Sequence, residues 1–344
     1  MKIVVDNAIP FIRGVFEPYA DVVYEQADLI GPETVRDADA LIVRTRTKID
    51  AALLEGSSVK IVATATIGTD HVDLPWCDEH GILVRNAAGC NAGGVAQYVF
   101  SGLYGAASRN AISLDGFTIG IVGVGNVGRR VQTMATSLGF KVLKNDPPRE
   151  EVEGPFEFTP LDELLKKSDV VTMHVPLNET TRHMADREFF KKMKKGAFFI
   201  NAARGEVVDE QALKEAIPRL GPVILDTWEH EPQIDRELMD MVAIATPHIA
   251  GYSYQGKQNG TAAAVRAIAH YFGIDPLKEF FPPTEHPEDE AVKLEVRGKK
   301  QGEITSLFQY NYPIFTDDFM FRLSPDSFEK LRAEYRYRRE IYFD

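Results

Sequence analysis

Three short strings in the second half of the chain hold residue types that can move a proton beside an anion. They are residues 200–205 (INAARG), 226–232 (DTWEHEP) and 246–251 (TPHIAG), and each follows an apolar run typical of a strand. Together they contain Arg204, several acids and two histidines. An arginine can bind an anion, a carboxylate can set the protonation of a histidine, and a histidine can accept a proton.

A glycine-rich string upstream, residues 123–128 (GVGNVG), has the spacing of a dinucleotide-binding turn. It lies between a pattern typical of a strand and a pattern typical of a helix, which is the context that such a turn requires. Gly123 would allow the tight turn, Gly125 would let the pyrophosphate approach the backbone, and Gly128 would let helix and strand pack closely. The string predicts a nucleotide site and, with the other three, a hydride-transfer reaction.

Asp146 follows the next predicted strand, 18 residues after Gly128. A carboxylate at this place can accept hydrogen bonds from the ribose hydroxyls and would repel a 2′-phosphate. We therefore expect NAD as the cofactor rather than NADP. Arg149 is close in sequence, and we expect Pro147 and Pro148 to turn its side chain outward.

Hydride transfer from a secondary alcohol needs a base for the hydroxyl proton. His248 is the candidate base, and Glu231 would bind its far nitrogen and favour the imidazolium that forms. Arg204 would hold a carboxylate and polarise the reacting oxygen. The groups of the same strings that compete for these roles are Asp226, Glu229 and His230.

Length and composition limit the class of protein. A chain of 344 residues is too long for one ordinary core, so two or three domains are expected. The formal charge of −12 disfavours nucleic acid and anionic membrane as partners, because both attract positive surfaces. The two cysteines form no metal or disulfide pattern, so we expect no metal site and a reducing, cytoplasmic location. The uncharged residues 86–108 include glycines and amides, and we interpret them as a buried helix rather than a membrane span.

Strands and helices alternate along most of the chain, which predicts parallel sheets with right-handed crossovers. The expected strands are residues 3–5, 22–24, 40–43, 60–63 and 82–84, then 118–122, 141–144, 170–175, 197–202, 223–226 and 242–245. Six strands in the second group is the count of a complete doubly wound nucleotide domain. The fold class that we expect is α/β, with two doubly wound parallel-sheet domains.

The character of the chain changes after Ile274. Prolines 282 and 283 and residues 285–290 indicate an exposed linker. The alternating aromatics of residues 308–312 indicate a strand with one apolar face, and residues 328–343 indicate a charged helix. We expect a small α+β domain that forms homodimers, because so many aromatic residues exceed what a short segment can bury. Packing against its own subunit is the alternative.

The three strings and the glycine-rich turn, in this order, resemble the D-2-hydroxyacid dehydrogenase family over roughly the first 275 residues. In that family three residues are catalytic: the arginine of the first string, the glutamate before proline in the second and the histidine of the third. In this chain they correspond to Arg204, Glu231 and His248. The resemblance also implies that a nucleotide domain is inserted into a substrate domain. The implied domains are residues 1–92 with 252–278 for substrate, 93–251 for NAD and 279–344 for dimerisation.

The resemblance also implies which residues contact the cofactor. Asp226 would lie on the nicotinamide side, and Val175 would offer only its backbone. The whole expected set is Gly123, Gly125, Asn126, Val127, Gly128, Asp146, Val175, Ala202, Ala203, Asp226 and Gly251.

One branch of the family is more similar than the rest. Residues 64–73 (TATIGTDHVD), 89–92 (GCNA), 248–252 (HIAGY) and 327–332 (SFEKLR) resemble the branch that oxidises 4-phospho-D-erythronate to 2-oxo-3-hydroxy-4-phosphobutanoate in pyridoxal 5′-phosphate biosynthesis. The resemblance implies that backbone N–H groups of Ile67 and Gly68 receive the substrate carboxylate. The substrate contacts implied are Arg44, Thr45, Thr66, Ile67, Gly68 and Tyr252.

With the resemblance given, the charges of residues 44–48 agree with a phosphorylated substrate. Arg44, Arg46 and Lys48 alternate after a predicted strand, so in an extended chain all three lie on one side. Such a cluster could hold a phosphate, and a solvated loop is the alternative.

Two other functions stay open at this point. A relative that acts on phosphoglycerate, glycerate, glyoxylate or hydroxypyruvate would carry the same trio. An NAD-sensing protein without catalysis would share the fold, but it would be expected to have a disordered tail that this sequence does not show. Tyr252 and residues 44–48 favour the four-carbon phosphate.

Overall fold

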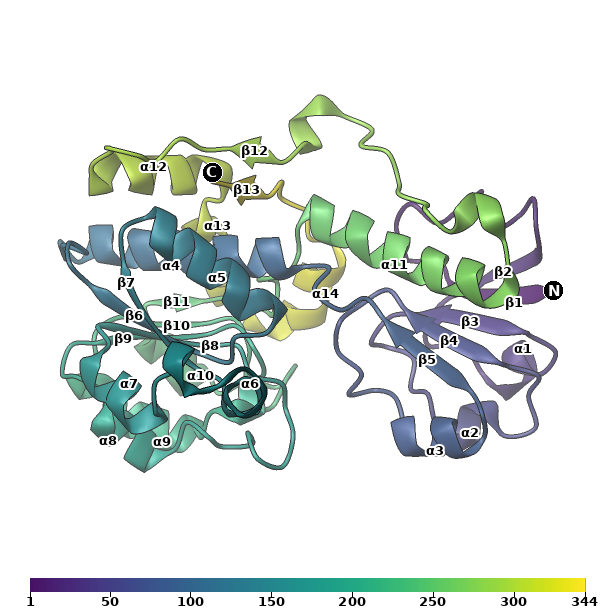
Figure 1. The fold of residues 1–344 in the computed structure, drawn as a ribbon, viewed down its shortest axis with the longest axis horizontal. Helices are drawn as coiled ribbons and strands as arrows, with labels where there is room; N and C mark the ends of the chain where they lie inside the picture. The colour runs from purple at the N-terminus through teal and green to yellow at the C-terminus, as the bar shows by residue number, and fades with distance from the viewer. Residues whose placement is uncertain (344) are drawn as a thin grey trace. The chain divides into compact units, whose positions relative to one another are not determined.

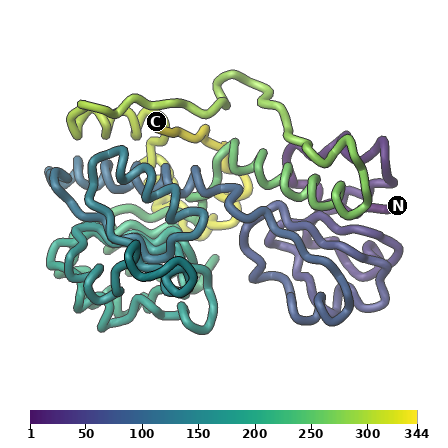
Figure 2. The backbone as a smooth tube through the Cα atoms, viewed as in Figure 1, coloured from purple at the N-terminus to yellow at the C-terminus, as the bar shows by residue number. Residues whose placement is uncertain are grey.

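The computed structural model describes residues 1–343, which form two compact units. Unit 1 contains residues 1–91 and 253–290, and unit 2 contains residues 92–252 and the described residues from Ala291 onward. The chain therefore leaves each unit once and returns to it, as the colours of Figure 2 show. Among the helices of residues 1–343, none has both the length and the apolar character that crossing a membrane requires.

Unit 1 is built on a five-stranded parallel sheet with the order β2-β1-β3-β4-β5. Its strands are β1 (Lys2–Asp6), β2 (Asp21–Glu25), β3 (Ala40–Val43), β4 (Ile61–Thr64) and β5 (Leu83–Asn86). Its helices are α1 (Pro32–Val35), α2 (Ala51–Leu54), α3 (Leu74–Glu79) and α11 (Tyr254–Phe272). The central strands are apolar throughout because helices cover both faces, α11 on one and α1 to α3 on the other (Figure 1).

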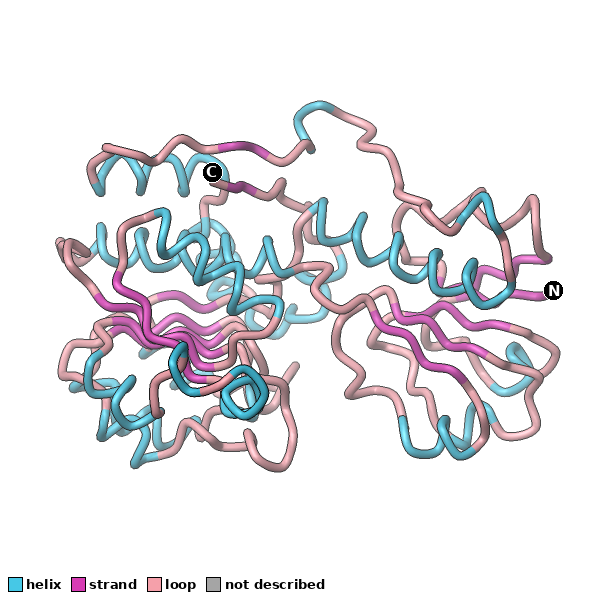
Figure 3. Tube along the Cα trace, in the orientation of Figure 1, coloured by secondary structure: helices cyan, strands magenta, loops and turns pink. Residues whose placement is uncertain are grey.

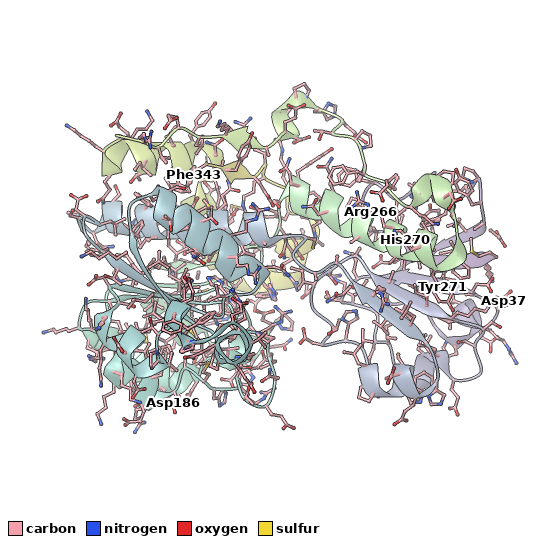
Figure 4. All side chains as sticks on the ribbon, in the orientation of Figure 1. Asp37, Asp186, Arg266, His270, Tyr271 and Phe343 are labelled. Carbon is pink, nitrogen blue, oxygen red and sulfur yellow. The ribbon has the colours of Figure 1, made fainter. Side chains whose placement is uncertain are left out.

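The long helix α11 has clear start and stop signals. Ser253 caps its first turn by accepting the N–H of Gly256 at 2.9 Å, and Gly273 ends it with a φ of 72°. The following segment folds back along the helix. There Arg266, which Figure 4 labels, donates from Nε to the carbonyl of Phe280 at 2.8 Å.

Unit 2 contains a six-stranded parallel sheet with the order β11-β10-β9-β8-β6-β7. Its strands are β6 (Thr118–Val122), β7 (Lys141–Asn145), β8 (Val170–Met173), β9 (Phe198–Asn201), β10 (Val223–Leu225) and β11 (Ile244–Ala245). The order reverses beside β6, and ligands of doubly wound sheets bind at such a switch point. All eleven strands that the sequence predicts in the two sheets are present, with ends that differ by up to two residues.

Helices cover both faces of this sheet. They are α4 (Ala92–Arg109), α5 (Asn126–Ser137), α6 (Pro147–Glu153), α7 (Leu161–Lys167), α8 (Arg187–Lys192), α9 (Glu210–Ala216) and α10 (Arg236–Met241). The uncharged helix α4 packs with α5 on one face, as expected for a buried helix, while α7 to α10 contribute to the core of the other (Figure 1). The helices α6, α8, α9 and α10 each follow an aspartate that accepts a first-turn N–H: Asp146, Asp186 (labelled in Figure 4), Asp209 and Asp235.

The tail differs from its prediction in secondary structure. It consists of β12 (Val292–Lys293), α12 (Gln301–Asn311), α13 (Ile314–Leu323), α14 (Phe328–Ala333) and β13 (Ile341–Tyr342), and Figure 3 shows its mainly helical content. The strand predicted at residues 308–312 is wrong, because most of that segment is the end of α12. Phe308 and Tyr312 are four residues apart and both buried, whereas Tyr310 is 81% exposed. Alternating aromatics resemble a strand only when Tyr310 is counted as a core residue.

The single charged helix predicted for residues 328–343 is also wrong. Helix α14 ends at Ala333, and β13 pairs with β12 in a small parallel sheet. The charged residue Arg338 is buried rather than solvated, so the segment does not present one polar face. Tail residues including Phe308 and Phe343 pack into the core of unit 2 beside α4, and Figure 4 labels Phe343.

Candidate active site

The polar residues that the sequence singles out lie at one edge of the unit 2 sheet. Neighbouring parallel strands end at the same edge, so the residues that follow them come together. Gly123 follows β6, Val175 lies two residues after β8, and Asn201 ends β9. Asp226 follows β10 and Thr246 follows β11.

His248 and Glu231 form a close pair at this edge. Nδ1 of His248 lies 2.7 Å from Oε2 of Glu231, and both side chains are partly exposed. The other carboxylate oxygen accepts the N–H of Trp228 at 2.9 Å. Burial by itself raises the pKa of Glu231, but the charge of His248 and these hydrogen bonds outweigh it, so this pKa lies below its ordinary value. An ionised Glu231 fixes the ring of His248 and leaves its Nε2 for a proton.

The geometry separates this pair from its competitors in the same strings. Glu229 binds a different histidine, with its Oε1 2.6 Å from Nε2 of His183. The backbone N–H of Glu229 donates to Glu210 at 2.8 Å. His230 is exposed to solvent.

The buried carboxylate of Asp226 organises the turn that carries His248. Its Oδ1 accepts from Oγ1 of Thr246 at 2.7 Å and from the N–H of Ile249 at 2.8 Å, and its Oδ2 accepts the N–H of Ala250 at 2.8 Å. The backbone carbonyl of Asp226 accepts the N–H of His248 at 2.7 Å. The sequence predicts Asp226 as a nicotinamide contact, and it did not reveal these bonds to the turn.

Arg204 and the second string are brought together by a glycine. A Cβ on Gly205 would lie 1.9 Å from the backbone carbonyl atoms of Trp228, so only glycine fits there. The guanidinium of Arg204 donates from Nη1 to the carbonyl of Ala203 at 2.8 Å. This close approach fixes the start of the second string against the end of the first.

The glycine turn has the local geometry that a pyrophosphate needs. Gly123 has a φ of 86°. A Cβ on Gly128 would lie 2.1 Å from the carbonyl oxygen of Gly123. Nothing lies within 4 Å of a Cβ built on Gly125, the N-cap of α5. Asn126 and Val127 form the first turn of that twelve-residue helix, whose N-terminus favours phosphate.

Asp146 and Arg149 meet at the glycine turn. Oδ2 of Asp146 accepts the N–H of Val124 at 2.7 Å, which leaves acceptor capacity for ribose hydroxyls. The expectation that the prolines turn Arg149 outward is wrong. Its Nη1 donates to the carbonyl of Val124 at 2.7 Å, while Nε and Nη2 bind Glu153 at 2.7 and 2.6 Å. The prolines begin α6, and the helix brings Arg149 back over the turn.

The other predicted cofactor residues lie close to these groups in sequence. Ala202 and Ala203 follow β9, and Gly251 lies in the turn after His248. Val175 is next to His174, whose backbone approaches within 2.7 Å of a Cβ built on Gly123. Contacts of all these residues with a cofactor stay predictions.

The cationic cluster predicted in unit 1 is wrong in its geometry. Residues 45 and 46 form a turn after β3 rather than an extended chain, so alternate side chains do not share one side. Arg44 is bound through Nε and Nη2 to the buried carboxylate of Asp6, at 2.8 and 3.1 Å. Lys48 forms an ion pair with Asp50 at 2.7 Å.

The remaining predicted substrate residues follow two adjacent strands or lie in unit 2. Thr45 follows β3, and Thr66, Ile67 and Gly68 follow β4, which pairs with β3 in parallel. Oγ1 of Thr66 lies 2.7 Å from Oγ1 of Thr64. Tyr252 belongs to unit 2, where its ring packs edge-to-face against two tail aromatics, Tyr335 and Tyr337.

Two tail arginines near the site were missed from the sequence. Arg332 lies 6.0 Å from the ring centre of Tyr252, and its charge helps to lower the pKa of Glu231. Arg338 binds the turn after His248. Arg332 ends the string 327–332 that carries part of the family resemblance, but no role at the site was inferred for it. No pattern marked Arg338, and both arginines lie about 80 to 100 residues from the residues they contact.

Comparison with known proteins assigns the chain that carries this site to a family. Residues 92–250 match the model of "D-isomer specific 2-hydroxyacid dehydrogenase, NAD binding domain". The chain is 45% identical to an erythronate-4-phosphate dehydrogenase of Bacteroides fragilis, over 99% of this chain and 97% of the relative. It is 44% identical to the enzyme of that name in Bacteroides thetaiotaomicron, with the same shares covered.

Solved structures are more distant. A NAD+-bound 3-phosphoglycerate dehydrogenase of Entamoeba histolytica superimposes with a TM-score of 0.68 at 29% identity, over 81% of this chain and 97% of that one. About a fifth of this chain is thus outside that match, whereas the curated relatives match over nearly all of it.

The fold, the glycine turn and the His–Glu pair define an NAD-dependent 2-hydroxyacid dehydrogenase. Within that class, the chain belongs to the erythronate-4-phosphate dehydrogenase family. The fold class predicted from the sequence and the predicted NAD cofactor are confirmed.

Proposed function

We propose that the protein oxidises 4-phospho-D-erythronate at C2 to 2-oxo-3-hydroxy-4-phosphobutanoate, a step of pyridoxal 5′-phosphate biosynthesis. The observation that carries this proposal is the His248–Glu231 pair in a chain that matches erythronate-4-phosphate dehydrogenases over 99% of its length. An enzyme for phosphoglycerate or glyoxylate would share the pair, but the curated relatives at 41–45% identity carry the erythronate name.

Three side chains divide the chemistry in this proposal. His248 accepts the C2 hydroxyl proton at Nε2, while Glu231 holds Nδ1 and stabilises the imidazolium. Arg204 binds the substrate carboxylate and the developing carbonyl oxygen. The backbone N–H groups of Ile67 and Gly68 also bind the carboxylate. Thr45, Thr66 and Tyr252 contact the rest of the substrate.

The phosphate needs a revised assignment within unit 1. Arg44 is already bound by Asp6, which holds its guanidinium at the carboxyl edge of β3. Arg44 therefore contributes a fixed, oriented positive charge rather than a mobile one, and we keep it in the proposed substrate set.

Residues of unit 2 fit NAD. When bound, the nicotinamide supplies the hydride acceptor. The open space at Gly125, the N-terminus of α5 and the carboxylate of Asp146 suit the pyrophosphate and the ribose. The proposed contacts also include Val175, Ala202, Ala203, Asp226 and Gly251.

We also propose that unit 1 is the substrate-binding part, that residues 93–251 are the NAD-binding part and that the tail forms a homodimer. The tail packs on unit 2, but several of its large apolar side chains are exposed. They are Tyr310 (81%), Phe319 (59%), Met320 (47%) and Leu323 (61%). A second copy is the partner that would cover them in the proposed homodimer.

The catalytic proposal is tested with a matched pair of glutamates. Glu231→Gln should lower kcat by about 10²- to 10⁴-fold, because it removes the carboxylate charge that orients His248. Glu229→Gln makes the same change in the same string and should leave kcat within about threefold, since Glu229 binds His183. Steady-state oxidation of 4-phospho-D-erythronate and 3-phosphoglycerate with NAD measures both variants and the wild type. Equal losses in the two variants would refute the assigned roles, and a wild type that prefers 3-phosphoglycerate would refute the substrate.

The cofactor preference is tested at the glycine turn. Asp146→Ser keeps the cap of α6 and removes the charge, and Glu153→Gln releases the guanidinium of Arg149. The double variant should raise the ratio of kcat/KM for NADP to that for NAD by about 10- to 100-fold, because Arg149 can then bind the 2′-phosphate. Glu150→Gln changes the same charge on the same helix and serves as the control. An unchanged ratio in the double variant would remove both residues from cofactor selection.

The homodimer is tested on the exposed face of α13. Phe319→Glu with Leu323→Glu places two charges one helical turn apart on that face and should yield monomers by light scattering. Phe156→Glu, at a fully exposed phenylalanine outside the tail, is the control and should leave the assembly unchanged. The far-UV circular dichroism of the variant should stay close to wild type, because neither Phe319 nor Leu323 is buried within its own subunit. A dimer that survives both substitutions would contradict the proposal.

A further inference from the structure

Arg338 is a buried tail arginine whose partners are backbone carbonyls of the turn after His248. The residue is 8% exposed. Its Nη1 donates to the carbonyls of Ile249 and Tyr252 at 3.1 and 3.3 Å, and its Nη2 donates to the carbonyl of Ala250. The planar guanidinium thus binds three of the four carbonyls that follow His248.

The same turn is held from its other side by Asp226. That carboxylate accepts the N–H groups of Ile249 and Ala250, each at 2.8 Å. The peptide groups of the turn therefore lie between a buried negative charge on their N–H side and a buried positive charge on their carbonyl side. Such an arrangement aligns the peptide dipoles and strengthens each hydrogen bond.

The turn needs this support because His248 has an unfavourable backbone conformation. Its φ of 56° lies in the left-handed region, which is unfavourable for a residue other than glycine. A strained conformation of this kind persists only where surrounding contacts determine it fully. Arg338 and Asp226 provide those contacts on the residues directly after His248.

The tail contributes more than one contact to this arrangement. Nη2 of Arg338 also donates to the carbonyl of Gly94 at 3.1 Å, in the first turn of α4. A Cβ on Gly93 would lie 2.0 Å from a carboxylate oxygen of Glu340, so the glycine leaves room for the tail to pack there. The tail segment is therefore fitted to this place rather than loosely associated.

The charge of Arg338 is balanced within the tail. Its Nη1 donates to the hydroxyl of Tyr335 at 3.2 Å, and that hydroxyl donates to Oδ2 of Asp317 at 2.9 Å. The guanidinium also lies 4.0 Å from the ring centre of Tyr312. A lysine cannot reproduce this pattern, because it presents a point charge rather than a planar fork of donors.

We infer that Arg338 is a positioning residue for the reaction: it holds the turn that places His248 against Glu231, so the C-terminal tail sets the catalytic rate. The inference rests on the proposed function, since an effect on rate presupposes that His248 is the base. It gives the tail a role within its own subunit that is independent of dimer formation.

The experiment compares Arg338→Lys and Arg338→Met with a control at Arg219. Arg219 is a partly exposed arginine of unit 2 that also donates to two backbone carbonyls, those of Phe190 and Met193. Both carbonyls belong to the C-terminal end of α8, which lies away from the His248 turn in sequence. Arg219→Met therefore removes comparable hydrogen bonds without touching the site.

The expected result separates rate from stability. Arg338→Met should lower kcat by about 100-fold and Arg338→Lys by about 10-fold, as expected when a catalytic group is misplaced by about 1 Å, with smaller changes in KM. Arg219→Met should lower the melting temperature but leave kcat of the folded enzyme within about threefold. Rates are measured at 25 °C per NAD-binding site, so that unfolded protein does not count.

Each outcome decides the inference. If folded Arg338→Lys retains wild-type kcat, the inference is overturned, and this holds even if Arg338→Met fails to fold. If Arg219→Met loses kcat as strongly as the Arg338 variants, the effect is general destabilisation and the inference is also overturned. If wild-type enzyme does not oxidise 4-phospho-D-erythronate, the proposed function fails instead, and the comparison is then made with the hydroxyacid that the wild type does oxidise.

Discussion

The left-handed turn at His248 is the constraint on which the site depends. A histidine with a φ of 56° stays in place only because the residues after it are bound on both sides. Asp226 binds their N–H groups and Arg338 binds their carbonyls. With the backbone fixed, the ring of His248 meets Glu231 at 2.7 Å and keeps Nε2 for substrate.

This constraint extends into the core of unit 2. Oγ1 of Thr246 donates to Asp226 at 2.7 Å, so the hydroxyl of Tyr98 on α4 must donate to Thr246 in turn. Burial raises the pKa of Tyr98 well above its ordinary value, which keeps that donor protonated. Trp228 adds a further link, from its Nε1 to the carbonyl of Thr246 at 2.9 Å. The buried helix α4 thus supports the same carboxylate that holds the catalytic turn.

The sequence allowed prediction of the elements and of the main chemical groups. Buried parallel strands are continuous apolar runs, and glycine strings mark turns that no other residue can form, so both leave local signals. The choice of Glu231 over Glu229 came from resemblance to a family, and the distances to His248 and His183 now support it. Local signals of this kind involve residues close together in the chain.

The interactions that the sequence did not reveal are those between distant segments or between charges. Asp6 binds Arg44 across the sheet of unit 1, and Glu153 draws Arg149 back over the glycine turn. A charge pattern shows neither the turn at residues 45 and 46 nor the partner of each charge, so the arrangement of three cations on one side of an extended chain was predicted wrongly. The burial of Arg338 was equally hidden, because a run of arginines is usually a solvated surface.

The most direct test of the strained turn is the kinetics of Asp226→Asn. An asparagine has the size of aspartate but offers one acceptor oxygen, so one of the N–H groups of Ile249 and Ala250 would face an amide donor. If the carboxylate holds the turn, kcat for the hydroxyacid should fall by about 100-fold, while the Kd for NAD measured by calorimetry stays within about threefold. Wild-type kcat would contradict that role, and so would a loss confined to the affinity for NAD, which would leave Asp226 with its proposed cofactor contact alone.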